Sequence, residues 1–340
     1  MLSQETHYWG GLYWPPLCLR HYPFFASVNK RNLRLPDVPS ERGALTCIRI
    51  AILSNVGTKE GLQRSGMILR RWAELISRGV VLRRHLPHEF QNLAIYVSPE
   101  ASLRYWRRDL SKVDPMLCDM VREMVKAGHV VWDVGANVGL FSFCAAALAG
   151  PSGYVLAIEP DFWLAHLVTR SAKELPKHGV AAPVVVLCAA AAENTGVGNF
   201  QIAERGRAAN HLAETQGSSQ AGGDRYSQRT ITVSLDFLLD YFPPPSVLKI
   251  DVEAAEVKVL QGSARLLRTA QPVIWCEVAP ENSKAVAEFL HQAGYEIYAA
   301  ALCASERTPL QRASWNTLAI PRSLVCQDSN PNRNQTQDRE

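Results

Sequence analysis

The sequence lacks the features of exported, membrane-spanning and disulfide-rich proteins. Its eight cysteines are scattered and none forms a C-x-x-C pair, which is typical of reduced thiols rather than of a disulfide framework or a zinc site. The N-terminus has no basic start followed by an apolar run, and no apolar stretch reaches the roughly 18 residues that a membrane-spanning helix needs. We therefore predict a cytoplasmic protein with no secretory signal and no membrane span.

Excess charge is also scarce. The formal net charge is +4 over 340 residues, and 47% of the residues are hydrophobic, which is ordinary globular composition. A nucleic-acid-binding domain is usually more basic, so no nucleic-acid partner is expected. Arginines gather between residues 70 and 108. There a solvated helical face is favoured over an RNA patch, and a site for an anionic group stays open.

No cluster of metal ligands stands out. His85, His88 and Glu89 lie close together in the sequence, but Pro87 breaks the helix that would place them on one face. We predict that the protein binds no metal.

The N-terminal part divides in two. Residues 1–45 are rich in aromatics, proline and arginine without periodicity, and they form a poorly defined extension to which we assign no function. Residues 46–128 predict an accessory α/β region, either a cap over an acceptor site or the surface of a homo-oligomer. Its predicted elements are a helix over 66–78, extended segments at 80–82 and 93–97, and a helix that Asp114 caps and that Gly128 ends.

From residue 129 the pattern alternates between short β-branched runs and helical patterns. The predicted strands are 129–134, 154–159, 183–188, 247–252 and 273–278. The predicted helices are 140–149, 162–175, 256–267 and 283–293. Apolar runs of this length, separated by helices, indicate parallel strands buried on both faces. We therefore predict an α/β domain over 129–321 with a doubly wound, mostly parallel sheet.

Three further segments carry predictions. Residues 295–300 and 316–321 predict a hairpin-like pair at the sheet edge. The Gly, Ser and Gln-rich stretch 206–229 predicts a mobile loop near the strand ends. The polar residues 322–340 predict a disordered tail.

The strongest motif is DVGANVG, residues 133–139, at the end of the first predicted strand of the α/β domain. Gly135 permits a tight turn and a close approach of the backbone to a ligand, and Gly139 lets the next helix pack against the strand. A dinucleotide fingerprint needs G-x-G-x-x-G, but here Ala136 and Asn137 follow the first glycine, so that the pyrophosphate would meet a side chain. Asp133 instead suits a cationic ligand, directly or through water, which favours S-adenosylmethionine over NAD.

Acidic residues follow the next two strands. Glu159, before Pro160, lies 26 residues after Asp133, near the spacing at which a carboxylate accepts the ribose hydroxyls. Its alternative is a helix cap, for which Asp161 is the better candidate. Glu193 is the only acid near the end of the third strand, where it would contact the adenine or lie in a solvated loop.

The fourth strand ends in LKIDVEAAE, residues 248–256. Asp251 and Glu253 alternate along an extended chain, so both are expected to face the ligand crevice. Either could serve as a general base for an acceptor hydroxyl, or both could only anchor the ligand and the loop. Glu256 is expected in the first turn of the following helix.

These stretches resemble the FkbM family of S-adenosylmethionine-dependent methyltransferases, a branch of the class I, Rossmann-like methyltransferases. The matching segments are DVGANVG, AIEPD, TVSLDFLL, LKIDVEAAEVKVLQG, WCEV and NTLAIP, in this order. The resemblance implies that residues 133–139 form the methionine-side loop, that Glu159 holds the ribose and that Asp251 lines the cofactor and acceptor crevice. It also implies O-methylation of a hydroxyl on a sugar or natural product, hence a small-molecule or glycan acceptor.

The chain departs from the family pattern at two places. Ala254 stands where the family usually has glycine, and it would be strained if the position needs a positive φ. His211 stands where a serine pair is more usual, and it is a candidate base on the acceptor side or a solvated loop histidine. The candidate bases are thus Asp251, Glu253 and His211. A catalytically silent methyltransferase-like module and an NAD-linked oxidoreductase remain the alternatives to the methyltransferase.

Overall fold

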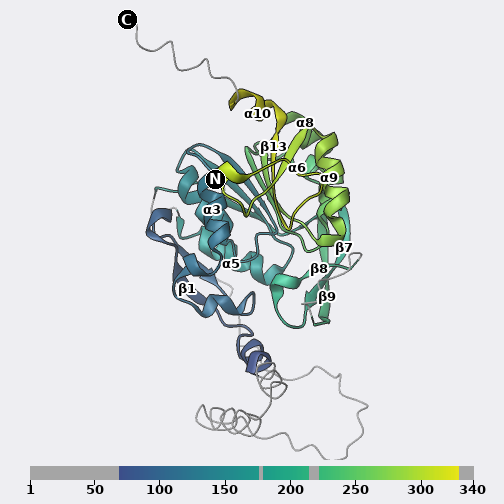
Figure 1. Ribbon diagram of the computed structural model, residues 1–340. Coiled ribbons are helices and arrows are strands. Elements are labelled where there is room, and N and C mark those ends of the chain that lie inside the picture. Colours follow the sequence, from purple (N-terminus) through teal and green to yellow (C-terminus); the bar gives the residue numbers. More distant parts are fainter. Residues whose placement is uncertain (1–68, 176–178, 214–221, 329–340) are drawn as a thin grey trace, which may run out of the picture. The chain divides into compact units, whose positions relative to one another are not determined.

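The computed structural model describes residues 69–175, 179–213 and 222–328 (Figure 1). The chain divides into two units, Met1–Leu62 and Gln63–Glu340, and all described residues belong to the second unit. The predicted N-terminal extension, residues 1–45, lies outside the described residues. The predicted helix over 66–78 also begins outside them. Within the described residues, 69–76 are helical.

A seven-stranded sheet forms the centre of the second unit, in the order β12-β13-β11-β10-β3-β4-β5. Its strands are β3 (Val130–Val134), β4 (Tyr154–Ile158), β5 (Val184–Leu187), β10 (Val247–Ile250), β11 (Val273–Glu277), β12 (Tyr295–Ala299) and β13 (Asn316–Pro321). Neighbouring strands are parallel except that β13 runs antiparallel to both β11 and β12. The predicted doubly wound, mostly parallel sheet and the edge pair are thus confirmed.

Helices cover both faces of this sheet (Figure 1). Three pack on one face and four on the other: α3 (Pro115–Met124), α4 (Leu140–Ala149) and α5 (Phe162–Ala172), then α6 (Leu235–Leu238), α7 (Glu256–Gln261), α8 (Ala264–Thr269) and α9 (Ser283–Gln292). A buried apolar core lies on each face of the sheet, and successive strand residues point into opposite cores. Val131 packs with the first set of helices and Trp132 with the second. Both are fully buried, which explains why the strands are apolar throughout.

The capping residues in the sequence predicted most helix starts correctly. The Asp114 carboxylate accepts from the backbone N–H of Leu117, and Asp161 caps α5. Two predicted ends are wrong. Helix α3 ends at Met124 because Val125 is extended, and the predicted helix 256–267 breaks at Gly262, where a Cβ would lie 2.4 Å from the carbonyl oxygen of Ala192.

A second sheet was not predicted. It contains β6 (Ala190–Ala191), β7 (Gly196–Ala203), β8 (His211–Leu212) and β9 (Asp224–Val233), in the order β6-β9-β7-β8. The predicted mobile loop at 206–229 is therefore wrong for its described part, which contains the 3-10 helix η5 (Arg207–Ala209), β8 and the first half of β9. Backbone pairing with β7 orders this half of β9 despite its low hydrophobic content.

The described N-terminal part packs beside α5. Strands β1 (Leu82–His85) and β2 (Ala94–Val97) form an antiparallel pair, and the backbone N–H of Tyr96 donates to the Ser171 hydroxyl at 2.8 Å. Three 3-10 helices lead on to α3: η1 (His88–Phe90), η2 (Leu103–Trp106) and η3 (Leu110–Lys112). At the other end, α10 (Arg322–Asp328) occupies the start of the predicted disordered tail, so that prediction is wrong for these residues.

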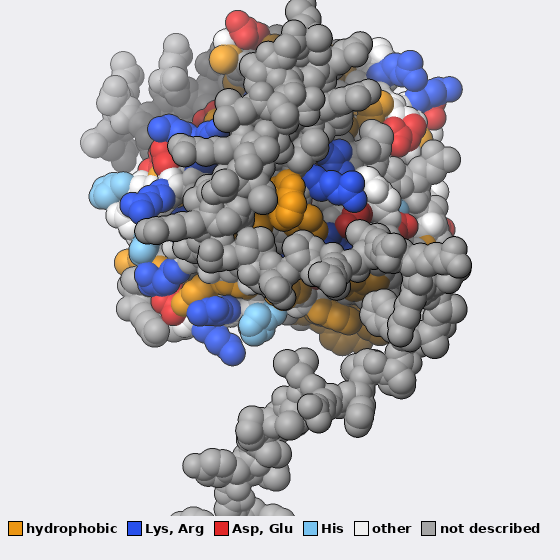
Figure 2. All heavy atoms as spheres, turned by 90° about the horizontal axis from the view of Figure 1, so that it is seen from below, with side chains coloured by type: hydrophobic (Ala, Val, Ile, Leu, Met, Phe, Trp, Pro, Cys, Tyr) orange, Lys and Arg blue, Asp and Glu red, His pale blue; other side chains and the backbone are white. Residues whose placement is uncertain are grey.

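Many of the N-terminal arginines are exposed and paired with acids. Arg78 contacts Glu204 at 2.7 Å, and Arg83 contacts Glu174 at 3.3 Å. Figure 2 likewise shows basic side chains interspersed with acidic and hydrophobic ones. This arrangement supports the solvated surface that the sequence favoured. Over the described ranges, no helix combines the length and apolar character that crossing a membrane requires.

Gly135, directly after β3, provides a test of how tightly the central strands fit. Its φ is +80°, and a Cβ there would lie 1.8 Å from the carbonyl oxygen of Asp251. Gly294, after α9, also has a positive φ, of +87°, but a Cβ there would meet nothing within 4 Å. We expect Gly294→Ala to cost about 1–2 kcal/mol of unfolding free energy from backbone strain alone.

Gly135→Ala is expected to cost about 3 kcal/mol or more, because the two strand ends must also move apart. Urea unfolding of both variants measures the difference. Equal losses would contradict the close contact between β3 and β10.

Candidate active site

The site lies where β3 and β10 end side by side. Here the order of the parallel strands reverses, since β4 and β5 extend the sheet on one side and β11 on the other. In such sheets this position leaves a crevice at the carboxyl ends of the strands. The turn after β3 is held by backbone N–H groups of Gly135 and Ala136, which both donate to the carbonyl of Ile158. Gly139 is the N-cap of α4, and a Cβ on it would meet the Phe143 ring at 2.8 Å.

A buried lysine joins the two strand ends. The Lys249 ammonium lies 3.1 Å from Asp133 and 3.3 Å from Asp251, and it donates to the carbonyl of Gly135 at 3.0 Å. Burial lowers the pKa of Lys249, but the carboxylates of Asp133, Asp251 and Glu277 outweigh it and the pKa is raised. The LKIDVEAAE motif contains Lys249, but the sequence did not predict a role for it in the site.

Asp133 has a different place from the one expected. Its side chain is fully buried, accepts from the Ser142 hydroxyl at 2.5 Å and pairs with Lys249. It does not line either pocket described below. Asp133 therefore orients Lys249 and the loop, and its direct contact with a cationic ligand stays a prediction.

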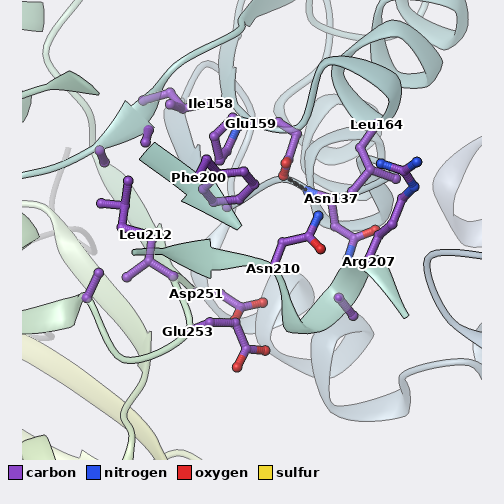
Figure 3. A pocket seen from close by; sticks show the side chains of 17 residues that line it. Asn137, Ile158, Glu159, Leu164, Phe200, Arg207, Asn210, Leu212, Asp251 and Glu253 are labelled. Atoms are coloured by element: carbon purple, nitrogen blue, oxygen red, sulfur yellow. Dashed lines mark hydrogen bonds between the residues drawn. The ribbon is translucent and has the colours of Figure 1, made fainter. Parts of the chain in front are cut away.

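The first pocket has the chemistry expected of a nucleoside site. Figure 3 shows Glu159 and Asn137 on one side and Asp251 and Glu253 on another. Apolar side chains of Leu164, Phe200 and Leu212 complete the wall, together with Ala190, Ala191 and Pro160. The apolar wall suits a planar base, and the carboxylates suit hydroxyl and amino groups.

Glu159, the predicted ribose ligand, lines this pocket. Its carboxylate accepts from the backbone N–H groups of Asn137 at 2.7 Å and Asp161 at 2.9 Å, which fixes its orientation and leaves lone pairs for two hydroxyls. Burial raises the pKa of Glu159 to about 8. The buried Asn137 Oδ1 has no partner among the described residues and is a further acceptor beside the pocket.

Glu193 and His211 do not reach this pocket. Glu193 is exposed, and the small sheet places Ala190 and Ala191 against the pocket instead. On β8, Leu212 lines the pocket, whereas His211 lies against Asp224 at 4.0 Å. The structure therefore separates both residues from Asp251 and Glu159.

A buried ion network supports the far wall. Arg207 lines the pocket and pairs with Asp161 at 2.6 Å and Glu100 at 2.9 Å, while Asn210 donates to Asp161 at 2.8 Å. Arg207 also lies over the Trp163 ring, 4.9 Å from its centre. The network connects the N-terminal part, the helix after Glu159 and the small sheet, and none of it was predicted beyond the Asp161 cap.

A second pocket adjoins the first, and Gly135, Asn137, Asp251 and Glu253 are among the residues that line both. Its other wall comes from the N-terminal part, residues 102–117, with Ser102, Arg104, Tyr105, Asp114 and Leu117. The described N-terminal residues thus enclose a space that opens on the nucleoside pocket.

Carboxyl groups dominate the boundary between the pockets. Burial, together with the charges of Asp251, Glu277 and Glu256, raises the pKa of Glu253 to about 8. Burial and Asp251 raise the pKa of Glu277 to about 7. Glu277 belongs to the WCEV segment, but the sequence did not predict it as a site residue. Over the described residues, no three or more side chains are grouped in a way that could hold a metal ion.

The loop after Asp251 carries the strain that the sequence suggested. Ala254 has a φ of +69° and Glu253 a φ of +46°. The surrounding contacts enforce this shape, because Ala254 N–H donates to Glu256 at 2.9 Å and Asn282 donates to both Glu256 and the carbonyl of Ala254. Ala254 therefore occupies a conformation that glycine adopts more readily.

The fold and the site define the class of protein. Numbered along the chain, the seven strands have the order 3-2-1-4-5-7-6 with the seventh antiparallel, and the pocket has the Glu159 carboxylate directly after the second strand. This is the class I, Rossmann-like methyltransferase fold.

The family follows from the sequence match. Residues 133–297 match the methyltransferase FkbM domain, so this part of the chain is an FkbM methyltransferase domain and the predicted resemblance is confirmed. S-Adenosylmethionine, the cofactor of these enzymes, is confirmed with it. A hexuronic acid methyltransferase, AglP, of Haloferax volcanii is 25% identical over 228 residues, which cover 66% of this chain and 87% of that protein.

Solved structures are similar at lower identity. The methyltransferase FkbM from Methylobacillus flagellatus has a TM-score of 0.36 at 15% identity, covering 59% of this chain and 49% of that one. An S-adenosylmethionine-dependent O-methyltransferase from Thermotoga maritima has a TM-score of 0.32 at 13% identity, covering 60% and 62%.

Glu159→Ala is expected to weaken S-adenosylmethionine binding at least about tenfold, because hydrogen bonds to the ribose hydroxyls are lost in a buried site. The matched control is Glu193→Ala, which removes the exposed acid outside the pocket. Calorimetric titration measures both. An equal loss in the two variants, or no loss in Glu159→Ala, would contradict the ribose assignment.

Ala254→Gly is expected to raise the unfolding free energy by about 1 kcal/mol, since glycine relieves the left-handed strain at a smaller entropic cost. Thermal and urea unfolding measure the change. The matched control is Ala208→Gly in η5, an exposed position without a positive φ, where glycine is expected to lower the stability. A less stable Ala254→Gly protein would show that the loop is not strained.

Proposed function

We infer that this methyltransferase transfers the methyl group of S-adenosylmethionine to a hydroxyl of a sugar acceptor. The observation that carries the proposal is the meeting of two pockets at Asp251 and Glu253. One pocket has the apolar wall and the ribose carboxylate of a nucleoside site. The other has the polar, carboxylate-rich wall that suits a ligand with many hydroxyl groups.

The residues divide the work between the two ligands. The turn after β3 and Asp251 would hold the amino-acid part of the cofactor, and Glu159 would hold its ribose. Bound S-adenosylmethionine supplies an electrophilic methyl group, and the protein aligns the acceptor oxygen with that methyl group and excludes water. An alcohol acceptor must also lose its proton as it attacks.

The similarity to a hexuronic acid methyltransferase supports a sugar as the acceptor. Nucleic acid is a poorer candidate, because several basic side chains of the N-terminal part are already paired with acids. Of the predicted accessory region, we propose that the described residues 69–128 serve as the cap, since residues 102–117 form a wall of the second pocket.

The arrangement does not favour an NAD-linked oxidoreductase. Asn137 stands where the dinucleotide fingerprint needs glycine, and its φ is +53°. A silent module would be indicated by cofactor binding without transfer to any hydroxyl.

The test is calorimetric titration with S-adenosylmethionine, S-adenosylhomocysteine and NAD, followed by an assay of S-adenosylhomocysteine release with methyl glycosides of hexoses and hexuronic acids. We expect binding of both sulfur ligands, no binding of NAD and release of the product only when a sugar is present. Binding of NAD alone would overturn the methyltransferase proposal, and release that needs no sugar would overturn the acceptor.

A further inference from the structure

One carboxyl group of the second pocket stands apart from the others. Glu277 is the last residue of β11. Cys276 before it pairs with Ile250, the last residue of β10, so Glu277 lies at the level of Asp251. Parallel neighbours at the same level point their side chains to the same face of a sheet. Glu277 lines the second pocket but not the nucleoside pocket.

The partners of the two carboxyl groups differ. Asp251 lies 3.3 Å from Lys249, whose ammonium also serves Asp133 and Gly135. Within the described ranges, the Glu277 side chain takes part in no hydrogen bond or ion pair that would consume its lone pairs. Asp251 is therefore committed to holding the strand ends together, whereas the Glu277 carboxylate is available to a ligand.

We propose that Glu277 is the general base that removes the proton from the acceptor hydroxyl. The inference rests on the proposed function and adds to it a catalytic residue. It also specifies the acceptor group as a neutral hydroxyl. The pocket has four carboxyl groups, Asp114, Asp251, Glu253 and Glu277, against two cations, Arg104 and the already paired Lys249, so its acids outnumber its bases and disfavour a further carboxylate.

The step balances without a further reactant. The acceptor oxygen forms a bond to the methyl carbon while the carbon–sulfur bond breaks and its electron pair stays on sulfur. The hydroxyl proton passes to the Glu277 carboxylate, and solvent takes it up after the product leaves. The product is a methyl ether, which alkali does not cleave.

The surroundings of Glu277 suit this role at neutral pH. Burial and the negative charges of Asp251, Asp114 and Glu256 raise its pKa to about 7, against the opposing effect of Lys249. A base is most effective when its pKa lies near the working pH. Since the base must be ionised to accept a proton, the rate is expected to rise with pH through about 7.

Glu277→Gln keeps the size of the side chain and removes the base. We expect the kcat to fall about 100-fold or more, the low-pH limb of the rate profile to disappear and the affinity for S-adenosylmethionine to stay unchanged. Glu277→Asp is expected to recover part of the rate together with the limb. The matched control is Glu281→Gln, which removes an exposed acid in the turn that follows β11 and is expected to leave every parameter unchanged.

Methyl glucoside and methyl glucuronoside are the probes, and Glu253→Gln is measured in parallel. Retention of the low-pH limb in Glu277→Gln, or its loss in Glu253→Gln alone, would overturn the assignment while leaving the methyltransferase intact. An alkali-labile methyl ester as the sole product would do the same, since a carboxylate needs no base. Absence of transfer to either sugar by the wild type, with S-adenosylmethionine bound, would overturn the sugar acceptor and the base together.

Discussion

The contacts of the buried Lys249 ammonium determine the geometry of the site. Two carboxylates and a backbone carbonyl surround one positive charge at the point where β3 and β10 end. Removal of either side of such a buried pair leaves an uncompensated charge, which is strongly destabilising. The turn after β3 and the carboxylate after β10 are therefore held as one unit, and Gly135 is the residue that lets the two backbones come close enough.

The other walls of the two pockets are connected to this junction by hydrogen bonds and ion pairs. The turn directs the backbone N–H of Asn137 to Glu159, and Asp161, two residues later, caps α5 and receives Arg207. Arg207 in turn ties Glu100 of the N-terminal part and the small sheet to the same helix start. Both pockets thus depend on a continuous chain of buried charges, in which each carboxylate is oriented by a neighbour rather than by solvent.

Much of the central domain could be predicted, because its strands are short apolar runs and its helices begin at recognisable caps. The glycine turn, Glu159 and the strained Ala254 were likewise visible in the sequence. The small sheet was not, since β7 contains two glycines and β9 is polar along most of its length. The Arg207 network and the exposure of Glu193 depend on that sheet. The same sheet explains His211, which the sequence offered as a base near the acceptor. Only the pairing of β8 with β7 shows that Leu212, and not His211, lines the pocket.

The acidic boundary between the pockets has a consequence for the order of events in each cycle. A sulfonium ion carries a positive charge, and the cluster of Asp251, Glu253 and Glu277 attracts it with little competition from Lys249, which is already paired. Methyl transfer turns the sulfonium into a neutral thioether, so the attraction vanishes at the moment when the ligand has been used. The same carboxylates therefore hold the product less strongly than the donor, which favours exchange for a new donor, while the contacts to the ribose and the amino-acid group remain.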